Sequence, residues 1–245
     1  MARAGGGWLS CSTSNMSSSE LRQQVLEANL ALPAHGLATL TWGNASGVER
    51  AEGIVAIKPS GVPYERLAAE DIVLIDLDGG EVVYGGRPST DTPTHLELYR
   101  AFDQIGGIAH THSTWATAWA QAGRPIPLLG TTHADLSAHP IPVTRALTDE
   151  EIAADYEEAT GVVLIEAVSE HGPVELPCAL VRGHAPFCWG ADAAEAVECA
   201  VTLEQVARLA LLTRTVDPEA GPLLDAVRQK HFERKHGPGA YYGQP

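Results

Sequence analysis

The sequence predicts a single α/β domain in which short strands are flanked by helices. The chain has 245 residues, 44% of them apolar, which is enough to bury a large core without disulfides. Segments with strand-like alternation are interspersed with segments of helical periodicity. No internal repeat or linker interrupts this order, and no window approaches the ~20 apolar residues of a membrane span. We therefore expect one soluble domain.

The charge balance and the cysteines limit the possible partners and location. The chain carries 31 acidic and 16 basic residues, for a net charge of -15, which argues against nucleic acid or an anionic membrane as a partner. A small anionic substrate stays possible, because a pocket sets its own local field. Cys11, Cys178, Cys188 and Cys199 have neither metal-site spacing nor the density of a secreted scaffold. Without a signal-peptide pattern, we predict reduced thiols and a cytoplasmic protein.

The first 19 residues differ in composition from the rest of the chain. Residues 1–19 are rich in Gly and Ser and have no periodic apolar pattern, so we predict a disordered extension before a folded domain at 20–245. Met16 stands just before the first helical pattern. This position suggests the hypothesis that Met16 is the natural start of the protein.

The first half of the domain predicts one helix followed by several strands. Leu21, Val25 and Leu30 have helical spacing, and Pro33 with Gly36 ends this helix. Strands are then expected at 37–42 and 53–61, where each runs into a turn. Residues 71–84 predict a hairpin around Asp78-Gly79-Gly80.

The second half alternates helices and buried strands. A helix begins near Thr92-Pro93, with Thr92 as its N-cap, and Thr148 to Glu151 form a capping box before a helix over roughly 149–159. The remaining elements are expected as a strand at 106–113, a helix after it, one or two strands at 177–189, and helices at 191–214 and 217–236.

A His-Thr-His run is the strongest local signal for chemistry. Side chains at i and i+2 of a strand project from one face, so His110 and His112 point the same way and offer nitrogen ligands for Zn²⁺ or a similar ion. His184, at the end of another predicted strand, is a third candidate, and Asp91 is a carboxylate candidate. The simpler alternatives are hydrogen bonds to backbone for the histidines and an ordinary helix cap for Asp91. Four other histidines have no comparable setting: His35, His95, His139 and His171.

Three pairs of turn residues suggest an anion site. Each pair offers free backbone N–H groups or hydroxyls near a predicted strand end, and Lys58 adds a positive charge beside one of them. Taken singly, each pair has only the usual residues of a turn. The pairs are Gly43-Asn44, Ser60-Gly61 and Ser89-Thr90.

Two further segments carry polar groups. Asp135 lies in a polar run between apolar segments and is a candidate general acid or base, although an Asx turn would also explain it. The run 228–236 is basic in an otherwise acidic chain. Tyr241-Tyr242 after it are unusually apolar for a free chain end, so we expect them to pack against protein, either in the same chain or on a neighbouring subunit. The chain has no GxGxxG, no Walker A motif and no GxSxG, so nucleotide binding and serine hydrolysis find no support.

Several long blocks together resemble the class II aldolase and epimerase family of sugar phosphates, and the resemblance extends from Glu20 to Gln244. The blocks include QVLEANLALPAHGLATLTWGN, IKPSGV, PSTDTPTH, GGIAHTHS, GTTHAD, APFCWG and RKHGPGAYYGQ. The resemblance implies an α/β/α sandwich around a mostly antiparallel sheet. It also implies a homotetramer of fourfold cyclic symmetry with active sites between adjacent subunits.

The resemblance also assigns roles to matching positions. His110, His112 and His184 look like zinc ligands, one ion per subunit, with Asp91 as the acidic member of the metal site. The three turn pairs look like the substrate-phosphate pocket. Asp135 and Tyr242 look like the acid/base residues, with Tyr242 supplied by a neighbouring subunit, while His231 and Arg234 look like weaker candidates for contacts near the phosphate.

The implied reaction is epimerisation of a phosphorylated ketopentose, L-ribulose 5-phosphate to D-xylulose 5-phosphate, by breaking and re-forming the C3–C4 bond. The implied pathway is L-arabinose or ascorbate catabolism, and divalent ions other than zinc stay possible. The alternatives are a class II aldolase such as one acting on L-fuculose 1-phosphate, a zinc hydrolase, and a non-catalytic module like the adducin head. By the resemblance, an aspartate at position 91 favours the epimerase over the aldolase, in which a glutamate is expected there. Thr90, and Arg182-Gly183 before His184, depart from the family pattern without removing a proposed ligand.

Overall fold

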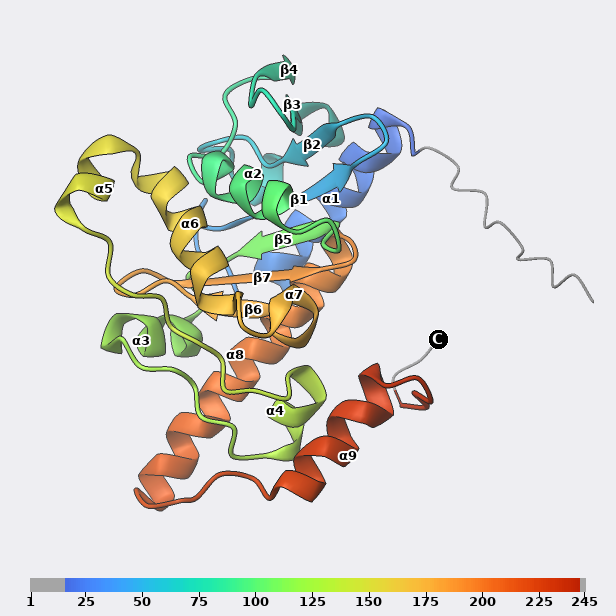
Figure 1. The fold of residues 1–245 in the computed structure, drawn as a ribbon. Coiled ribbons are helices and arrows are strands. Elements are labelled where there is room, and N and C mark those ends of the chain that lie inside the picture. Colours follow the sequence, from blue (N-terminus) through green and yellow to red (C-terminus); the bar gives the residue numbers. More distant parts are fainter. Residues whose placement is uncertain (1–15, 243–245) are drawn as a thin grey trace, which may run out of the picture.

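A seven-stranded sheet forms the middle layer of the computed structural model, which describes residues 16–242 (Figure 1). The strand order is β4-β3-β2-β1-β5-β7-β6, and every neighbouring pair is antiparallel. This confirms the expected mostly antiparallel sheet. The strands are β1 (Asn44–Glu49), β2 (Ile54–Ile57), β3 (Val73–Asp76), β4 (Val82–Tyr84), β5 (Gly107–His110), β6 (Cys178–Leu180) and β7 (Pro186–Gly190).

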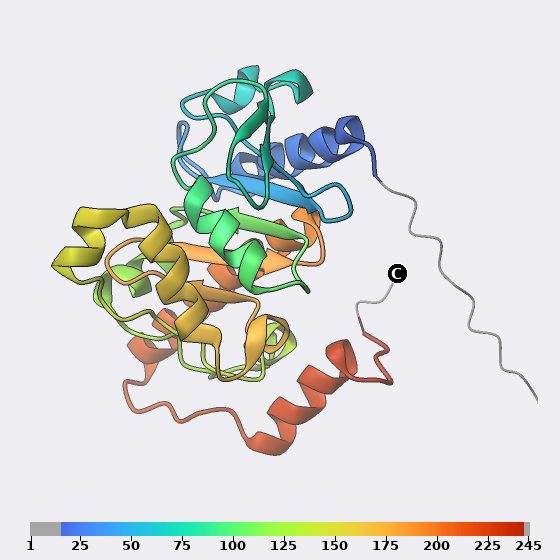
Figure 2. The same ribbon diagram turned by 45° about the horizontal axis from the view of Figure 1, so that its top comes forward.

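Helices cover both faces of the sheet and complete the three layers (Figures 1 and 2). On one face α1 and α8 pack through Leu21, Leu32 and Leu203, and on the other α2 and α6 pack through Leu98 and Leu164. The helices are α1 (Ser18–Ala34), α2 (Thr92–Ala101), α3 (Thr114–Ala122), α4 (Thr131–Leu136), α5 (Asp149–Ala154), α6 (Tyr156–Val168), α7 (Gly172–Glu175), α8 (Ala193–Val216) and α9 (Asp225–His236), with short 3-10 turns at Tyr64–Arg66 and Ala69–Asp71. None of these helices combines the length and apolar character needed to cross a membrane.

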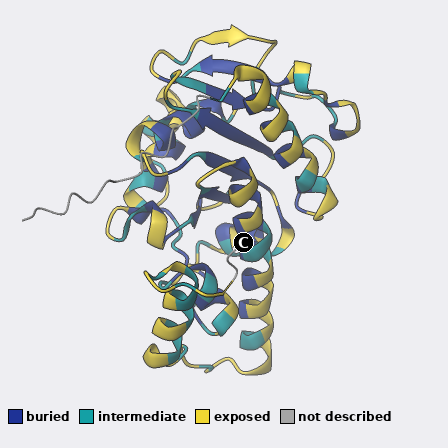
Figure 3. Ribbon diagram, turned by 90° about the vertical axis from the view of Figure 1, so that its right-hand side faces the viewer, coloured by how far each residue is buried: buried dark blue, intermediate teal, exposed yellow. Residues whose placement is uncertain are grey.

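Burial is concentrated in the sheet, while the end of α8 projects from it. Figure 3 shows the central strands as buried and the outer sides of the helices as exposed. The second half of α8 extends beyond the sheet next to α4, and α9 packs against α4 (Figure 1). Its apolar residues Leu209, Leu212 and Val216 are 41%, 45% and 87% exposed. A single chain therefore leaves apolar surface on this projection.

The predicted domain boundary at Glu20 falls too late. Ser17 is the N-cap of α1 and forms a capping box with Glu20, and Met16 packs against the core. The start of α1 was missed because serine is common in loops and is also a favoured N-cap residue, so the Ser-rich composition did not distinguish the two. The expected disorder of residues 1–15 and the hypothesis about the start of the chain concern residues that lie outside the described part.

The strand predicted at 37–42 is wrong, and β1 lies just after it instead. Residues 37–43 are irregular, with a turn at 40–41 in which Leu40 has a φ of 56°. β1 has little strand propensity, but tertiary contacts hold it: the Asn29 amide bonds both the N–H and the C=O of Ala45. A Cβ on Gly47 would lie 3.1 Å from Val25, so this glycine lets α1 pack closely on the strand.

Other sequence predictions differ from the structure mainly at helix ends. The 71–84 hairpin, the Thr148 capping box and the helix near Pro93 are confirmed, although Asp91 rather than Thr92 occupies the N-cap position. The helix after Thr148 breaks at Asp155, whose side chain caps α6. The last helix begins at Asp225 instead of 217.

We predict that Gly107→Ala destabilises the fold. A Cβ on Gly107 in β5 would lie 2.2 Å from the backbone carbon of Asp192, just before α8, so strand and helix must separate. Overpacking of this kind typically costs about 1–3 kcal/mol, and backbone contacts place this site at the upper end. Chemical denaturation of the variant measures the loss. Gly86→Ala is the control, since nothing lies within 4 Å of its Cβ; equal stability of both variants would contradict the prediction.

Candidate active site

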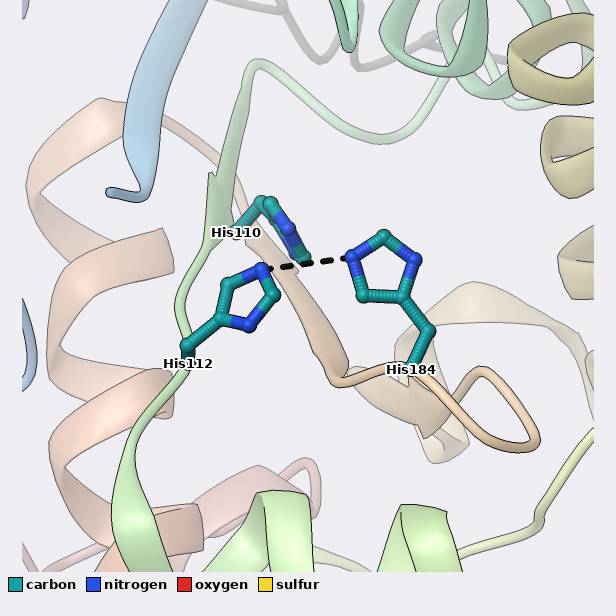
Figure 4. A group of neighbouring side chains, drawn as sticks. All are labelled: His110, His112 and His184. Atoms are coloured by element: carbon teal, nitrogen blue, oxygen red, sulfur yellow. Dashed lines mark hydrogen bonds between the residues drawn. The ribbon is translucent and has the colours of Figure 1, made fainter. Parts of the chain in front are cut away.

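The end of β5 forms the centre of the candidate site. His110 is the last residue of β5 and lies opposite Asn44 of β1 on one side and Phe187 of β7 on the other. His112 follows two residues later, and His184 lies in the turn between β6 and β7. Adjacent strands thus bring three histidines from distant parts of the sequence to one point, with their rings facing each other (Figure 4).

The three imidazole rings form a nearly equilateral triangle. The centroid separations are 5.0 Å for His110 and His112, 5.0 Å for His110 and His184, and 4.9 Å for His112 and His184. The Nε2 atoms of His112 and His184 are 3.2 Å apart. Two nitrogens bound at about 2.0–2.1 Å to a tetrahedral zinc ion are separated by roughly this distance. The donor set and its spacing therefore fit a zinc-like ion.

Hydrogen bonds outside the triangle direct ring nitrogens into it. His110 Nδ1 donates to the Pro186 carbonyl at 3.0 Å, which leaves Nε2 with its lone pair for an ion, and the ring stacks on Phe187 with centroids 4.1 Å apart. His184 Nδ1 is 3.0 Å from the Tyr156 hydroxyl. Such outer partners fix the tautomer and orientation of metal-binding histidines.

The environment also favours the neutral, ligating form of the histidines. Burial, reinforced by His110 and His112, lowers the pKa of His184 to about 4. Burial and then His110 lower the pKa of His112. Protons therefore compete little with a metal ion at neutral pH.

Asp91 lies beside the triangle in the same cavity, but it is not among the residues whose donor atoms lie within 4.8 Å of one another. Its carboxylate accepts a hydrogen bond from the Asn44 amide at 2.6 Å and forms no cap for α2. Burial acts to raise the pKa of Asp91, but His110, His95 and the Asn44 amide lower it overall. A partly buried negative charge therefore adjoins the three histidines.

The cavity has a volume of about 600 Å³, and all three predicted turn pairs line it together with the histidines and Asp91. Lys58 also lines it, is 2% exposed, and lies 4.9 Å from the Tyr64 ring. Burial lowers the pKa of Lys58. Within residues 16–242 no carboxylate forms an ion pair with Lys58. This buried amine gives the cavity a place for an anion.

Five residues of the cavity wall were not among the candidates from the sequence: Thr41, Trp42, Pro59, Tyr156 and Glu157. Trp42 is 55% exposed at the rim, with its ring centroid 6.4 Å from that of His112. Tyr156 and Glu157 begin α6 directly after the break at Asp155. The sequence pattern predicted one continuous helix here, so it gave no signal that these side chains face the histidines.

Asp135 and Tyr242 lie outside the cavity of their own chain. Asp135 is on α4, where the Arg234 guanidinium bonds both of its oxygens at 3.0 and 2.7 Å. The same guanidinium lies 4.0 Å from the centre of the Tyr242 ring. His231 Nδ1 is 3.2 Å from Asp135. The structure therefore gathers these four residues into one group on α4, α9 and the tail. His231 and Arg234 contact Asp135, not the expected phosphate pocket of the same chain.

Comparisons with known proteins identify the family. The family model described as "Class II Aldolase and Adducin N-terminal domain" matches residues 23–211. The chain is 53% identical over 225 residues to proteins named "L-ribulose-5-phosphate 4-epimerase UlaF" from Salmonella paratyphi C (strain RKS4594) and Salmonella choleraesuis (strain SC-B67). In both cases the match covers 92% of this chain and 99% of the relative.

Solved structures share the fold. An L-fuculose 1-phosphate aldolase superposes with a TM-score of 0.76 at 26% identity, covering 90% of this chain and 98% of that one. The L-fuculose-1-phosphate aldolase from Thermus thermophilus gives a TM-score of 0.64 at 26% identity, covering 84% of this chain and 100% of that one.

We predict that Tyr156→Phe weakens zinc binding about 10–100-fold, because His184 loses the partner that orients its ring. Competition with a chromophoric chelator measures the affinity. Tyr84→Phe is the matched control, since Tyr84 lies on β4 outside the cavity and packs against Arg22 only through its ring. Equal zinc affinity in the two variants would show that the Tyr156 hydroxyl has no positioning role.

Proposed function

The chain belongs to the class II aldolase and adducin N-terminal domain family, and we propose that it is an epimerase interconverting L-ribulose 5-phosphate and D-xylulose 5-phosphate. The observation that carries this proposal is that two groups of residues line one cavity, and we call them its two poles. One is the histidine triangle of His110, His112 and His184, and the other is buried Lys58 with the hydroxyl and turn groups. A phosphorylated ketose has two matching ends. The 53% identical relatives bear the name of this reaction.

The histidine triangle is the pole for the ketose end of the substrate. We propose that His110, His112 and His184 bind one zinc ion and that Asp91 offsets its charge. A divalent ion held there would polarise the ketose oxygens and stabilise the negative charge that develops as the C3–C4 bond breaks. The neutral state of His112 and His184 keeps the triangle available at neutral pH.

The second pole holds the phosphate. Lys58 supplies the charge, and the proposed donors are Gly43, Asn44, Ser60, Gly61, Ser89 and Thr90. Asn44 already donates to Ser89 Oγ at 3.0 Å and to Asp91, so it joins the two poles of the cavity. Retention of the phosphate keeps the aldehyde fragment in place after bond cleavage. The fragment can then turn its other face to the three-carbon fragment before the bond re-forms.

Asp135 and Tyr242 move the protons in this proposal, and both come from a neighbouring subunit. One group removes the proton of the C4 hydroxyl as C3–C4 breaks, and the other protonates the C4 oxygen after the aldehyde has turned. The support is their position: Arg234 holds both residues together, outside the cavity of their own chain. A second copy that brings this group to the cavity completes the site.

A homotetramer with fourfold cyclic symmetry would provide that arrangement. The projection of α8 and the segment after it leave Leu212, Val216 and Leu224 at 45%, 87% and 73% exposed, as expected for a surface that another copy covers. A cytoplasmic role in L-arabinose or ascorbate catabolism is part of the same proposal.

Product analysis tests the reaction. Zinc-loaded protein is incubated with L-ribulose 5-phosphate, and the products are followed by NMR. The proposal predicts zinc-dependent formation of D-xylulose 5-phosphate with little free aldehyde. Accumulation of dihydroxyacetone and glycolaldehyde phosphate would instead identify an aldolase, and absence of turnover would contradict both activities.

We predict that Tyr242→Phe lowers kcat by about 100-fold or more while zinc content stays unchanged, because the variant loses a proton-transfer group but no metal ligand. His112→Ala is also expected to be inactive, through loss of the zinc at the triangle. Steady-state kinetics and metal analysis of the purified tetramers measure both effects.

Mixing these two variants tests whether a site is shared. Random reassembly of equal amounts places an intact triangle opposite an intact Tyr242 in about one quarter of the sites, so about one quarter of wild-type activity is expected to return. Mixing either variant with itself is the control. No recovery in proven mixed tetramers would contradict the contribution of Tyr242 from a neighbour.

A further inference from the structure

A second group of metal-ligating side chains lies outside the cavity. His139 follows α4, while His171 and Glu175 lie at the two ends of α7. One donor atom from each of the three residues lies within 4.8 Å of the other two. None of these residues lines the cavity or contacts the histidine triangle. The proposed epimerase reaction leaves the group without a role.

The three side chains already face one another. His139 Nε2 is 3.0 Å from Glu175 Oε2, and the rings of His139 and His171 stack with centroids 3.6 Å apart and planes 10° apart. His171 and Glu175 are four residues apart on one helical turn, which places both on the same side. Rotation of the two rings out of their stacked arrangement would direct two imidazole nitrogens and one carboxylate oxygen to a common point.

The backbone that carries these ligands is fixed by hydrogen bonds. Ser137 Oγ donates to the Glu175 carbonyl at 2.8 Å and accepts from the His139 N–H at 3.1 Å. Buried His133 donates from Nε2 to the His139 carbonyl at 3.0 Å. The segment after α4 is thus tied to α7 before any ion binds. Preorganisation of this kind lowers the cost of assembling a metal site.

We propose that His139, His171 and Glu175 bind a second divalent transition-metal ion. Two imidazole nitrogens and one carboxylate suit Zn²⁺, Ni²⁺ or Cu²⁺, whereas Mg²⁺ and Ca²⁺ prefer oxygen ligands alone. The side chains of His139, His171 and Glu175 are 24%, 31% and 50% exposed, so the site is open to solvent and water completes the ligand shell. Glu170, 4.0 Å from His171 Nε2, adds negative charge that attracts a cation.

An ion there would clamp the segment that follows the proposed acid/base residue. Asp135 is on α4, only four positions before His139, and α7 lies across from this segment. An ion that binds only the folded protein stabilises it by mass action, in proportion to the logarithm of its concentration. The second ion therefore stabilises the α4 region and takes no part in bond cleavage.

The simplest competing interpretation is a pH-dependent ion pair between His139 and Glu175, capped by the His171 ring and binding no metal. Zinc stoichiometry separates the two interpretations. The background is His112→Ala/His184→Ala, which removes two ligands of the triangle and makes the result independent of the proposed function. Equilibrium dialysis against Zn²⁺ followed by elemental analysis gives the number of ions per chain.

The proposal predicts one bound zinc per chain in this background and two in the wild type. Adding His171→Ala is expected to abolish the remaining ion, and adding Glu175→Gln, which keeps the side-chain shape, to weaken its binding at least about 10-fold. Adding His35→Ala, at an exposed histidine after α1, is the matched control and is expected to leave it unchanged. No zinc bound in the background, or the same zinc content after His171→Ala, would overturn the proposal.

Copper provides a second readout that reports on the ligands. Cu²⁺ added to the same background is expected to give an electron paramagnetic resonance spectrum with hyperfine splitting from imidazole nitrogens. That splitting is expected to disappear in the variant that also carries His171→Ala. A spectrum unchanged by His171→Ala would assign the copper to another site and overturn the proposal.

Discussion

The register of β5 between β1 and β7 is the constraint on which the site depends. It places His110 opposite Asn44 of β1 and Phe187 of β7. The histidine therefore adjoins Asn44 of the proposed phosphate pocket, and its ring stacks on the ring of Phe187. Because a shift by one residue would turn His110 to the other face, the histidine triangle exists only in this register. Gly107 has no Cβ and therefore lets β5 pack directly against the backbone at Asp192, just before α8.

Burial makes the two poles of the cavity chemically different. At one pole, desolvation and the neighbouring His110 lower the pKa of His112 and His184 and so favour their neutral forms, beside a negative Asp91; this combination attracts a metal ion. At the other, Lys58 has been moved out of water without a carboxylate partner among the described residues, so an incoming phosphate would supply the missing charge. A chain with a net charge of -15 can therefore still hold an anion.

The sequence predicted which residues line the cavity better than it predicted the course of the backbone. The alternation of a strand was enough to place His110 and His112 together, and turn residues indicated the opposite pole. β1 was missed because Asn, Ser and Gly have low strand propensity, and only the contact of Asn29 with Ala45 reveals why they form a strand. Tyr156 was missed because a helix break decides its direction. The common contact of Asp135 and Tyr242 with Arg234 arises from long-range packing that no local pattern encodes.

We propose that three histidines on neighbouring strand ends hold one metal ion in the cavity. Anomalous X-ray diffraction at the zinc absorption edge, on crystals of the zinc-loaded protein, tests it most directly. A strong peak is expected within about 2.0–2.1 Å of nitrogens of His110, His112 and His184. Full zinc loading without a peak inside this triangle would contradict it.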